Sequence, residues 1–147
     1  MVSGIFLLSL FAKPVEQNTA GNIALLFISE LYDSQEFIIE HIEPVFSRDN
    51  QKTFYVVHLE GNGWVLISAD DVVQPVLAYS LENRFLPEQE WNDAARYILN
   101  SYKEQISLAV ENKSLAQHPG WEQLIQPAQK KSASTIIEPF IDVTWNQ

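Results

Sequence analysis

Residues 54–79, FYVVHLEGNGWVLISADDVVQPVLAY, give the clearest indication of the fold, because short apolar runs alternate there with polar breaks. Runs of β-branched and aromatic residues between turn residues are typical of strands, so we predict strands at 54–59, 64–68 and 76–79. The break at 60–63 predicts a tight hairpin, because its glycines and asparagine tolerate the positive φ angles of such a turn. Strands joined by short connections predict an antiparallel meander.

Upstream of this stretch, residues 37–39 and 45–46 continue the strand pattern on either side of Pro44. Proline cannot donate to a ladder, so it predicts an edge strand or a break. A helix is predicted from Thr19, with Asn18 or Thr19 as its cap and its end near residues 32–34. Its apolar stripe, at steps of three and four, is Ala20, Ile23, Ala24, Phe27, Ile28 and Leu31.

Downstream, a longer helix is predicted from Pro87 to about Val110. Glu88 and Glu90 are expected in its first turn, where the positive end of the helix dipole favours carboxylates. The chain thus predicts an α+β fold, an antiparallel β-meander packed against an N-terminal helix and a long C-terminal helix. The apolar stripe of the second helix is Trp91, Ala95, Ile98, Tyr102, Ile106 and Ala109.

Composition narrows the classes of protein. The 147 residues carry 9 Lys and Arg against 19 Asp and Glu, a formal net charge of −10. A chain this acidic, with no basic cluster, is not expected to bind nucleic acid. The chain has no cysteine, which excludes disulfides, thiolate metal sites and a cysteine nucleophile within these residues. Its length and apolar content suit one folded domain.

The beginning of the chain is set apart by a short apolar run at residues 4–12, which is bounded by Lys13 and Pro14. The run is too short to span a bilayer, which takes about 20 apolar residues. We predict a signal segment at 1–17, with a buried N-terminal strand or helix as the alternative. The mature domain, residues 18–112, is then expected outside the cell or in the periplasm and not in a membrane.

Beyond the second helix, residues 113–135 are predicted to be a linker with a short helical turn at 121–125 and a processing region. Lys130 and Lys131 lie in that region, and they are candidates either for processing or for solubility alone. Residues 136–147 are apolar again and are expected to begin a further domain.

Candidate chemistry is sparse. His41, His58 and His118 are scattered without metal-ligand spacing, so no metal or cofactor is predicted. His58 is interpreted as a hydrogen-bonded sheet residue in preference to a ligand. Asp70 and Asp71 could hold a hard cation, but adjacent side chains on an extended segment point to opposite sides, which favours a turn role. No nucleophile elbow, phosphate-binding glycine loop or zinc-helix motif occurs, so catalysis is not expected.

Several of these stretches resemble the prodomain, or Spi-type inhibitor domain, of streptopain-like (C10) cysteine peptidases. They are the aromatic strand at 54–57, the Gly-Trp-Val-Leu-Ile-Ser-Ala-Asp-Asp strand at 63–71, and Pro-Val-Leu-Ala-Tyr-Ser at 75–80. Ser-Tyr-Lys-Glu-Gln-Ile at 101–106 is similar to the end of the long helix of that family. Two stretches near the end of the sequence resemble the start of the mature peptidase, namely Pro139-Phe140-Ile141 and Thr144-Trp145-Asn146-Gln147.

The resemblance implies inhibition by a non-catalytic domain. Such a prodomain docks on the catalytic domain, in cis or in trans, and keeps its Cys-His pair unproductive until it is cleaved; that pair would lie beyond Gln147. The family places an asparagine near the start of the long helix in the active site. Counting back from Ser101 without gaps reaches Ala94, and the nearest asparagine is Asn92. Asn92 and Asp93 are therefore the predicted inhibitory contacts, with a solvated first-turn role as the alternative.

Two other functions stay open at this point. One is a freestanding inhibitor of the same fold, encoded apart from its protease, against which the mature-like residues 144–147 argue. The other is a secreted α+β binding module without a protease partner, because small α+β domains host many functions. Continuation of the reading frame past Gln147 into a segment with Cys and His distinguishes the prodomain from the freestanding inhibitor.

Overall fold

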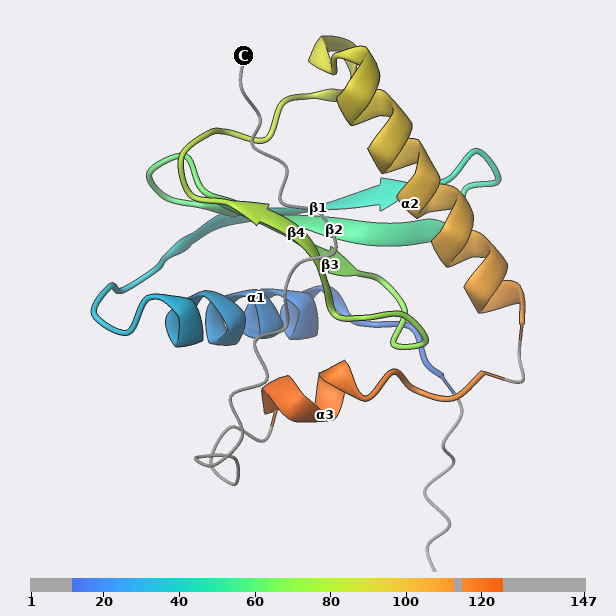
Figure 1. Ribbon diagram of the computed structural model, residues 1–147, viewed down its shortest axis with the longest axis horizontal. Helices are drawn as coiled ribbons and strands as arrows, with labels where there is room; N and C mark the ends of the chain where they lie inside the picture. Colours follow the sequence, from blue (N-terminus) through green and yellow to red (C-terminus); the bar gives the residue numbers. More distant parts are fainter. Residues whose placement is uncertain (1–11, 113–114, 126–147) are drawn as a thin grey trace, which may run out of the picture.

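The computed structural model describes residues 12–112 and 115–125 (Figure 1). In chain order the elements are α1 (Gln17–Leu31), β1 (Ile39–Phe46), β2 (Lys52–Leu59), β3 (Trp64–Ser68), β4 (Val76–Ser80), the 3₁₀ turn η1 (Glu88–Glu90), α2 (Asp93–Glu111) and α3 (Gly120–Ile125). The sheet order is β1-β2-β3-β4 and each neighbouring pair is antiparallel. The predicted α+β meander with its two helices is confirmed.

The predicted hairpin joins β2 to β3. Gly61 and Asn62 adopt φ angles of 84° and 76°. Positive φ angles are typical of tight hairpin turns, and glycine and asparagine are the residues that adopt them most readily. The Leu59 N–H donates to the Gly63 carbonyl at 2.8 Å and closes the turn. Glycine and asparagine are thus favoured here because they tolerate positive φ angles, as predicted.

β1 is an edge strand, as Pro44 predicts. The strand does not break at the proline, and Pro44 pairs in register with Tyr55 of β2. An edge strand tolerates a residue without a backbone N–H, because it has a neighbouring strand on one side only. Irregularities occur between Ile39 and His41 and between Val45 and Phe46. Ile39 and the predicted run at 45–46 therefore belong to one strand of eight residues that continues through Pro44, and residues 37–38 precede it.

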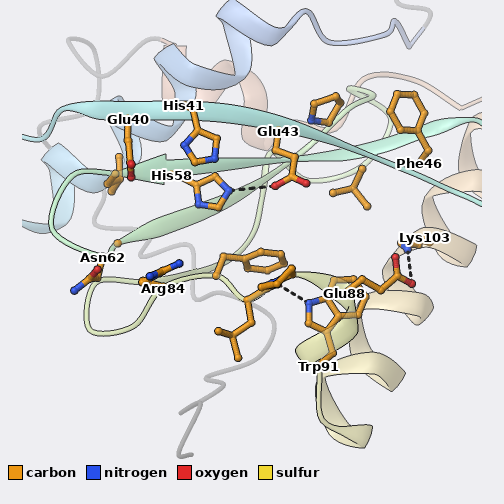
Figure 2. A pocket seen from close by; sticks show the side chains of 17 residues that line it. Glu40, His41, Glu43, Phe46, His58, Asn62, Arg84, Glu88, Trp91 and Lys103 are labelled. Carbon is orange, nitrogen blue, oxygen red and sulfur yellow. Dashed lines mark hydrogen bonds and ion pairs between the residues drawn. The ribbon is translucent and has the colours of Figure 1, made fainter.

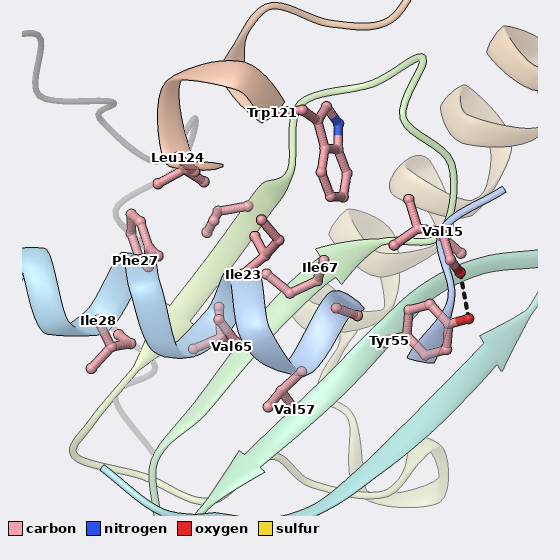
Figure 3. Close-up of a cluster of buried hydrophobic side chains, with 14 of the residues drawn as sticks. Val15, Ile23, Phe27, Ile28, Tyr55, Val57, Val65, Ile67, Trp121 and Leu124 are labelled. Carbon is pink, nitrogen blue, oxygen red and sulfur yellow. Dashed lines mark hydrogen bonds between the residues drawn. The ribbon is translucent and has the colours of Figure 1, made fainter. Parts of the chain in front are cut away.

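The helices cover opposite faces of the sheet. Figure 1 shows α1 and α3 on one side and α2 on the other. This explains why β2 and β3 read as unbroken apolar runs, since most of their side chains are buried on either face. The core on the α1 side (Figure 3) consists of Val15, Ala20, Ile23, Ala24, Phe27, Ile28, Tyr55, Val57, Leu59, Val65, Ile67, Ala69, Val76, Trp121 and Leu124. The core on the α2 side consists of Phe54, Val56, Trp64, Leu66, Leu77, Ala78, Trp91, Ala95, Leu99, Tyr102 and Ile106.

The start of α1 differs from the prediction. Its N-cap is Glu16, which makes no side-chain capping hydrogen bond, and both Asn18 and Thr19 lie inside the helix. The extended segment before the helix determines this start. The Val15 N–H donates to the Ala69 carbonyl at 2.9 Å, and the Tyr55 hydroxyl donates to the Val15 carbonyl at 2.7 Å. Tertiary hydrogen bonds therefore place the helix start, and the side-chain cap prediction was wrong.

The predicted start of the long helix at Pro87 is also corrected. Glu88 and Glu90 belong to the separate turn η1, so they do not lie in the first turn of α2. Trp91 follows in an extended conformation, is buried, and donates its indole N–H to the Leu86 carbonyl at 2.7 Å. The chain must bend there to bury the indole against the sheet, and this interrupts the helical pattern.

The segment predicted as a linker at 113–135 contains the predicted helical turn, which is α3. Trp121 and Leu124 of α3 are buried in the core on the α1 side (Figure 3). The Trp121 indole N–H also donates to the Val73 carbonyl at 2.8 Å. The described part of this segment, residues 115–125, therefore packs as part of the domain.

Three predicted features lie outside the described residues: most of the signal segment, the processing residues Lys130 and Lys131, and the mature-like residues 136–147. Residues 12–17 of the predicted signal segment are described, and they lead into α1 as given above. Within residues 12–112 and 115–125, no helix is long and apolar enough to cross a membrane.

Candidate functional site

The predicted inhibitory residues lie at the start of α2. The Asn92 side-chain oxygen accepts a hydrogen bond from the Ala95 N–H at 2.8 Å, which makes Asn92 the N-cap of the helix. Asn92 and Asp93 are both exposed to solvent. The structure thus places both side chains on the surface, at a fixed position. Contact with a protease stays a prediction for both.

The segment before Asn92 is held firmly by aromatic packing. The Phe85 ring meets the rings of Trp64 and Trp91 edge-on, at centroid distances of 5.2 and 6.1 Å. The Lys103 ammonium lies 5.3 Å from the Trp91 ring and 3.8 Å from a Glu88 carboxylate oxygen. These contacts from α2 back to the preceding loop fix the angle at which the chain reaches the helix.

The solvent side of α2 carries two large apolar side chains. Tyr97 is 78% exposed and Leu108 is 67% exposed. They are about three helical turns apart, so they lie on one line along the helix. We call the surface of Asn92, Asp93, Tyr97 and Leu108 the outer α2 face. Exposed aromatic and aliphatic side chains at the centre of a surface are typical anchors of protein interfaces.

The outer α2 face was missed from the sequence, although a signal for it was present. Tyr97 and Leu108 are apolar residues that fall outside the predicted core stripe of the long helix. Leu99, which is buried, was also left out of that stripe. Placing every apolar residue on a helical wheel from Asp93 onward separates a buried side from a second, exposed apolar line.

A cavity of about 660 Å³ lies beside the start of α2 (Figure 2). Its walls come from β1, from the β2–β3 hairpin and from the segment 84–91. Charged residues of both signs line it, including Glu40, Arg84, Glu88 and Lys103. The part of β1 that α2 leaves uncovered therefore forms one wall of a polar groove.

His41, Glu43 and His58 meet on this wall, which corrects the expectation of scattered histidines. The imidazole rings of His41 and His58 stack at a centroid distance of 4.0 Å and an angle of 13°. The Nε2 atom of His58 lies 3.4 Å from a Glu43 carboxylate oxygen (Figure 2). One donor atom of each side chain lies within 4.8 Å of the other two, which is close enough to hold a metal ion.

Strand register explains why the histidines meet. His41 and His58 are directly opposite one another in the β1–β2 ladder. Glu43 is two residues further along β1, on the same face, and thus diagonal to His58. The prediction failed because it left residues 40–44 outside any strand. A continuous strand through Pro44, in the observed register, places the two histidines opposite one another.

The environment of His58 disfavours its charge. Burial lowers the pKa of His58, and the nearby His41 lowers it further, while Glu43 and Glu40 oppose part of the effect. Its Nε2 atom is buried and makes no hydrogen bond with any described residue. His58 is therefore a sheet residue as predicted, and its Nε2 atom has a 3.4 Å contact with the Glu43 carboxylate in place of the expected hydrogen bond.

Asp70 and Asp71 have the predicted turn role. Asp70 accepts a hydrogen bond from the Val72 N–H at 3.0 Å. The Asp71 carboxylate accepts from the Lys13 backbone N–H and, at 2.8 Å, from the Gln117 amide. Burial raises the pKa of Asp70; the hydrogen bond from Val72 opposes this, and the charge of Asp71 adds to it. The Asp70 carboxylate stabilises the β3–β4 connection from within, and the Asp71 carboxylate ties it to the segments of Lys13 and Gln117.

Comparison with known proteins agrees with this architecture. The family of Spi protease inhibitors matches residues 12–106, and the chain belongs to this family, which is the prodomain family of C10 peptidases. Neither the curated proteins nor the solved structures gave a match. The resemblance noted in the sequence is confirmed, and the family implies a non-catalytic domain with a protease partner.

Proposed function

We propose that the chain is the prodomain of a secreted or periplasmic streptopain-like cysteine peptidase, which it docks on and keeps latent until proteolytic removal. The observation that carries the proposal is the family match, which spans the described elements from α1 through most of α2. The proposal adds to the family a particular partner, a location and a mode of release.

The outer α2 face supplies the docking surface in this proposal. An inhibitory segment must fill the active-site groove without presenting a well-aligned peptide carbonyl for attack. The start of a helix meets this need, because its backbone is already folded and its side chains project outward. Asn92 and Asp93 would reach the groove, while Tyr97 would provide the apolar anchor beside it.

Release in cis is favoured over a freestanding inhibitor. Residues 139–141 and 144–147 resemble the start of the mature peptidase, which a separately encoded inhibitor does not need. Lys130 and Lys131 precede these residues and offer a processing region. Sequencing the gene past Gln147 tests this part: a segment with a catalytic Cys and His supports the prodomain, and a stop codon there supports the freestanding inhibitor.

Steady-state titration tests the inhibition itself. The purified chain is added to a mature streptopain-like peptidase, and hydrolysis of a fluorogenic peptide is followed. We expect inhibition at micromolar or lower concentrations of the chain. Ile125→Ala is the control for substitutions on the outer α2 face, because Ile125 is 55% exposed on α3, which lies across the sheet from α2. Absence of inhibition at micromolar concentrations would favour a plain binding module.

A further inference from the structure

The cluster of His41, Glu43 and His58 is not needed for the proposed docking surface, and it calls for its own explanation. Two imidazoles and one carboxylate converge from neighbouring strands on the wall of the cavity (Figure 2). Strand register brings the three side chains together, and it leaves open what the cluster does. Imidazole and carboxylate are, however, common ligands of divalent transition metals.

The distances fit a metal with little rearrangement. Donor atoms bound to one tetrahedral zinc ion at about 2.0–2.1 Å are about 3.3 Å from each other. The His58 Nε2 atom and the Glu43 carboxylate oxygen are 3.4 Å apart, which is close to this separation. The third donor, on His41, lies within 4.8 Å of both. A movement of His41 alone would complete the set of three.

His41 can make that movement, and the stacking of the two rings means that one ring has to turn before both can bind the same ion. Two parallel rings cannot both point their nitrogen lone pairs at one ion. His41 is exposed on the edge strand, where its side chain is free to change rotamer. His58 is held by β2 and by the neighbouring Phe85 ring, whose centroid is 6.3 Å away.

The Nε2 atom of His58 has a Glu43 carboxylate oxygen at 3.4 Å but no well-formed hydrogen bond, and this points to a ligand. The atom is buried and makes no hydrogen bond with any residue that the structure describes. Buried polar atoms without a partner are rare, because burial removes the water that would otherwise satisfy them. A metal ion would satisfy this nitrogen and the Glu43 carboxylate together.

The charges around the cluster are compatible with a cation. Glu40 lines the same cavity and adds negative charge beside Glu43. Of the two basic residues on the cavity wall, Lys103 is paired with Glu88, and Arg84 remains on the side of the hairpin (Figure 2). The net charge of −10 also favours a cation over an anion at any surface site.

We propose that His41, Glu43 and His58 bind a divalent transition-metal ion of the zinc type, with the remaining coordination position open to the cavity. Imidazole ligands favour zinc, copper or nickel over magnesium and calcium, which prefer oxygen ligands alone. The site links the edge strand β1 to β2, so an ion there would join the two strands through their side chains. No step of the proposed inhibition depends on it.

Isothermal titration of the tag-free chain with zinc ions alone tests the proposal. We expect one ion per chain, with a dissociation constant in the micromolar range or below. His41→Gln is the main variant, because His41 is exposed and its loss leaves the core intact. Removing one ligand should weaken binding by about tenfold or more. His58→Gln and Glu43→Gln should do the same.

His118→Gln is the matched control, because His118 lies just before α3, on the side of the sheet opposite α2, and accepts a hydrogen bond from the Gly120 N–H. This variant should bind zinc as the unmodified chain does. Cobalt(II) gives a second measurement, since binding by nitrogen and oxygen ligands of a four-coordinate site produces strong visible absorption. No binding at about 100 μM zinc, or equal binding by the His41→Gln and His118→Gln variants, overturns the proposal.

Discussion

The side-chain oxygen of Asn92 accepts a hydrogen bond from the Ala95 N–H at 2.8 Å, so the residue proposed to reach the protease also caps α2. A capping oxygen satisfies one of the backbone donors left free in the first turn of a helix. Any loss of inhibition on replacing Asn92 can therefore come from a lost contact or from a frayed helix. The two effects must be separated by the choice of substitution.

Replacing Asn92 by serine separates them. Asn92→Ser keeps a capping oxygen and should leave the free energy of unfolding nearly unchanged, whereas Asn92→Ala should lower it by about 0.5–2 kcal/mol. If the Asn92 amide contacts the protease, both variants should weaken inhibition by about tenfold. Urea denaturation and inhibition constants check the two parts. Full inhibition by the serine variant would show that the amide makes no essential contact.

Tyr97 is expected to anchor the interface. Tyr97→Ala removes a 78% exposed ring, so it should leave the free energy of unfolding within about 0.5 kcal/mol of the unmodified chain. It should nevertheless raise the inhibition constant by about tenfold or more, because a buried tyrosine at an interface is often a hot spot. The Ile125→Ala variant should inhibit normally. Equal inhibition by both variants would place the docking surface elsewhere.

Trp121 is expected to make α3 a required part of the domain. Its side chain is 2% exposed, and Trp121→Ala should lower the free energy of unfolding by about 3–5 kcal/mol through loss of burial and a residual cavity. Ile125→Ala on the same helix should change it by no more than about 0.5 kcal/mol. Chemical denaturation of both variants tests this. A small effect at Trp121 would mean that α3 is dispensable.

Asp70 should make the stability depend on pH. Burial raises the pKa of Asp70, so the folded state holds this proton more tightly than the unfolded state does. Stability from this group therefore falls as pH rises from the usual aspartate range through the folded pKa, and is constant above it. Asp70→Asn keeps an oxygen acceptor for the Val72 N–H and removes the charge.

The Asp70→Asn variant should thus unfold at a higher temperature than the unmodified chain at about pH 7, and the difference should disappear by about pH 3. Thermal melts at the two pH values measure it. The surface variant Asp93→Asn removes the same unit of charge, so it would show the same difference at about pH 7 and the same disappearance by about pH 3 if only net charge mattered. A less stable Asp70→Asn variant at neutral pH would contradict the explanation.

Processing is expected between residues 127 and 136, where Lys130 and Lys131 lie. The chain is incubated with an active streptopain-like peptidase, and the new N-termini are sequenced. Exposed polar segments are preferred sites of cleavage, whereas paired strands resist it. New termini inside β3 or β4 would contradict this prediction. A Lys130→Ala, Lys131→Ala double variant shows whether the lysines direct the cleavage.

Local sequence patterns were sufficient for the fold because they coincide with the tertiary structure. The β2–β3 turn needs positive φ angles at Gly61 and Asn62, and those residue types reveal it. The starts of α1 and α2 could not be predicted in the same way. They depend on Tyr55, which binds the Val15 carbonyl, and on Trp91, whose burial bends the chain. Both helix starts thus depend on tertiary contacts, which a local sequence pattern does not reveal.

The candidate sites were less predictable than the fold. Asn92 was found only through the resemblance to a family, and its capping role followed from the structure. The meeting of His41 with His58 depends on strand register, which a single misplaced break at Pro44 concealed. A site made from neighbouring strands becomes visible only when the register is known.

Occlusion of the catalytic cysteine is the central claim, and alkylation of that cysteine measures it most directly. A mature streptopain-like peptidase is treated with iodoacetamide alone and with increasing amounts of the chain, which has no cysteine of its own to react. We expect the rate of modification to fall to near zero at one chain per peptidase. A rate that stays unchanged at a saturating concentration of the chain would contradict it.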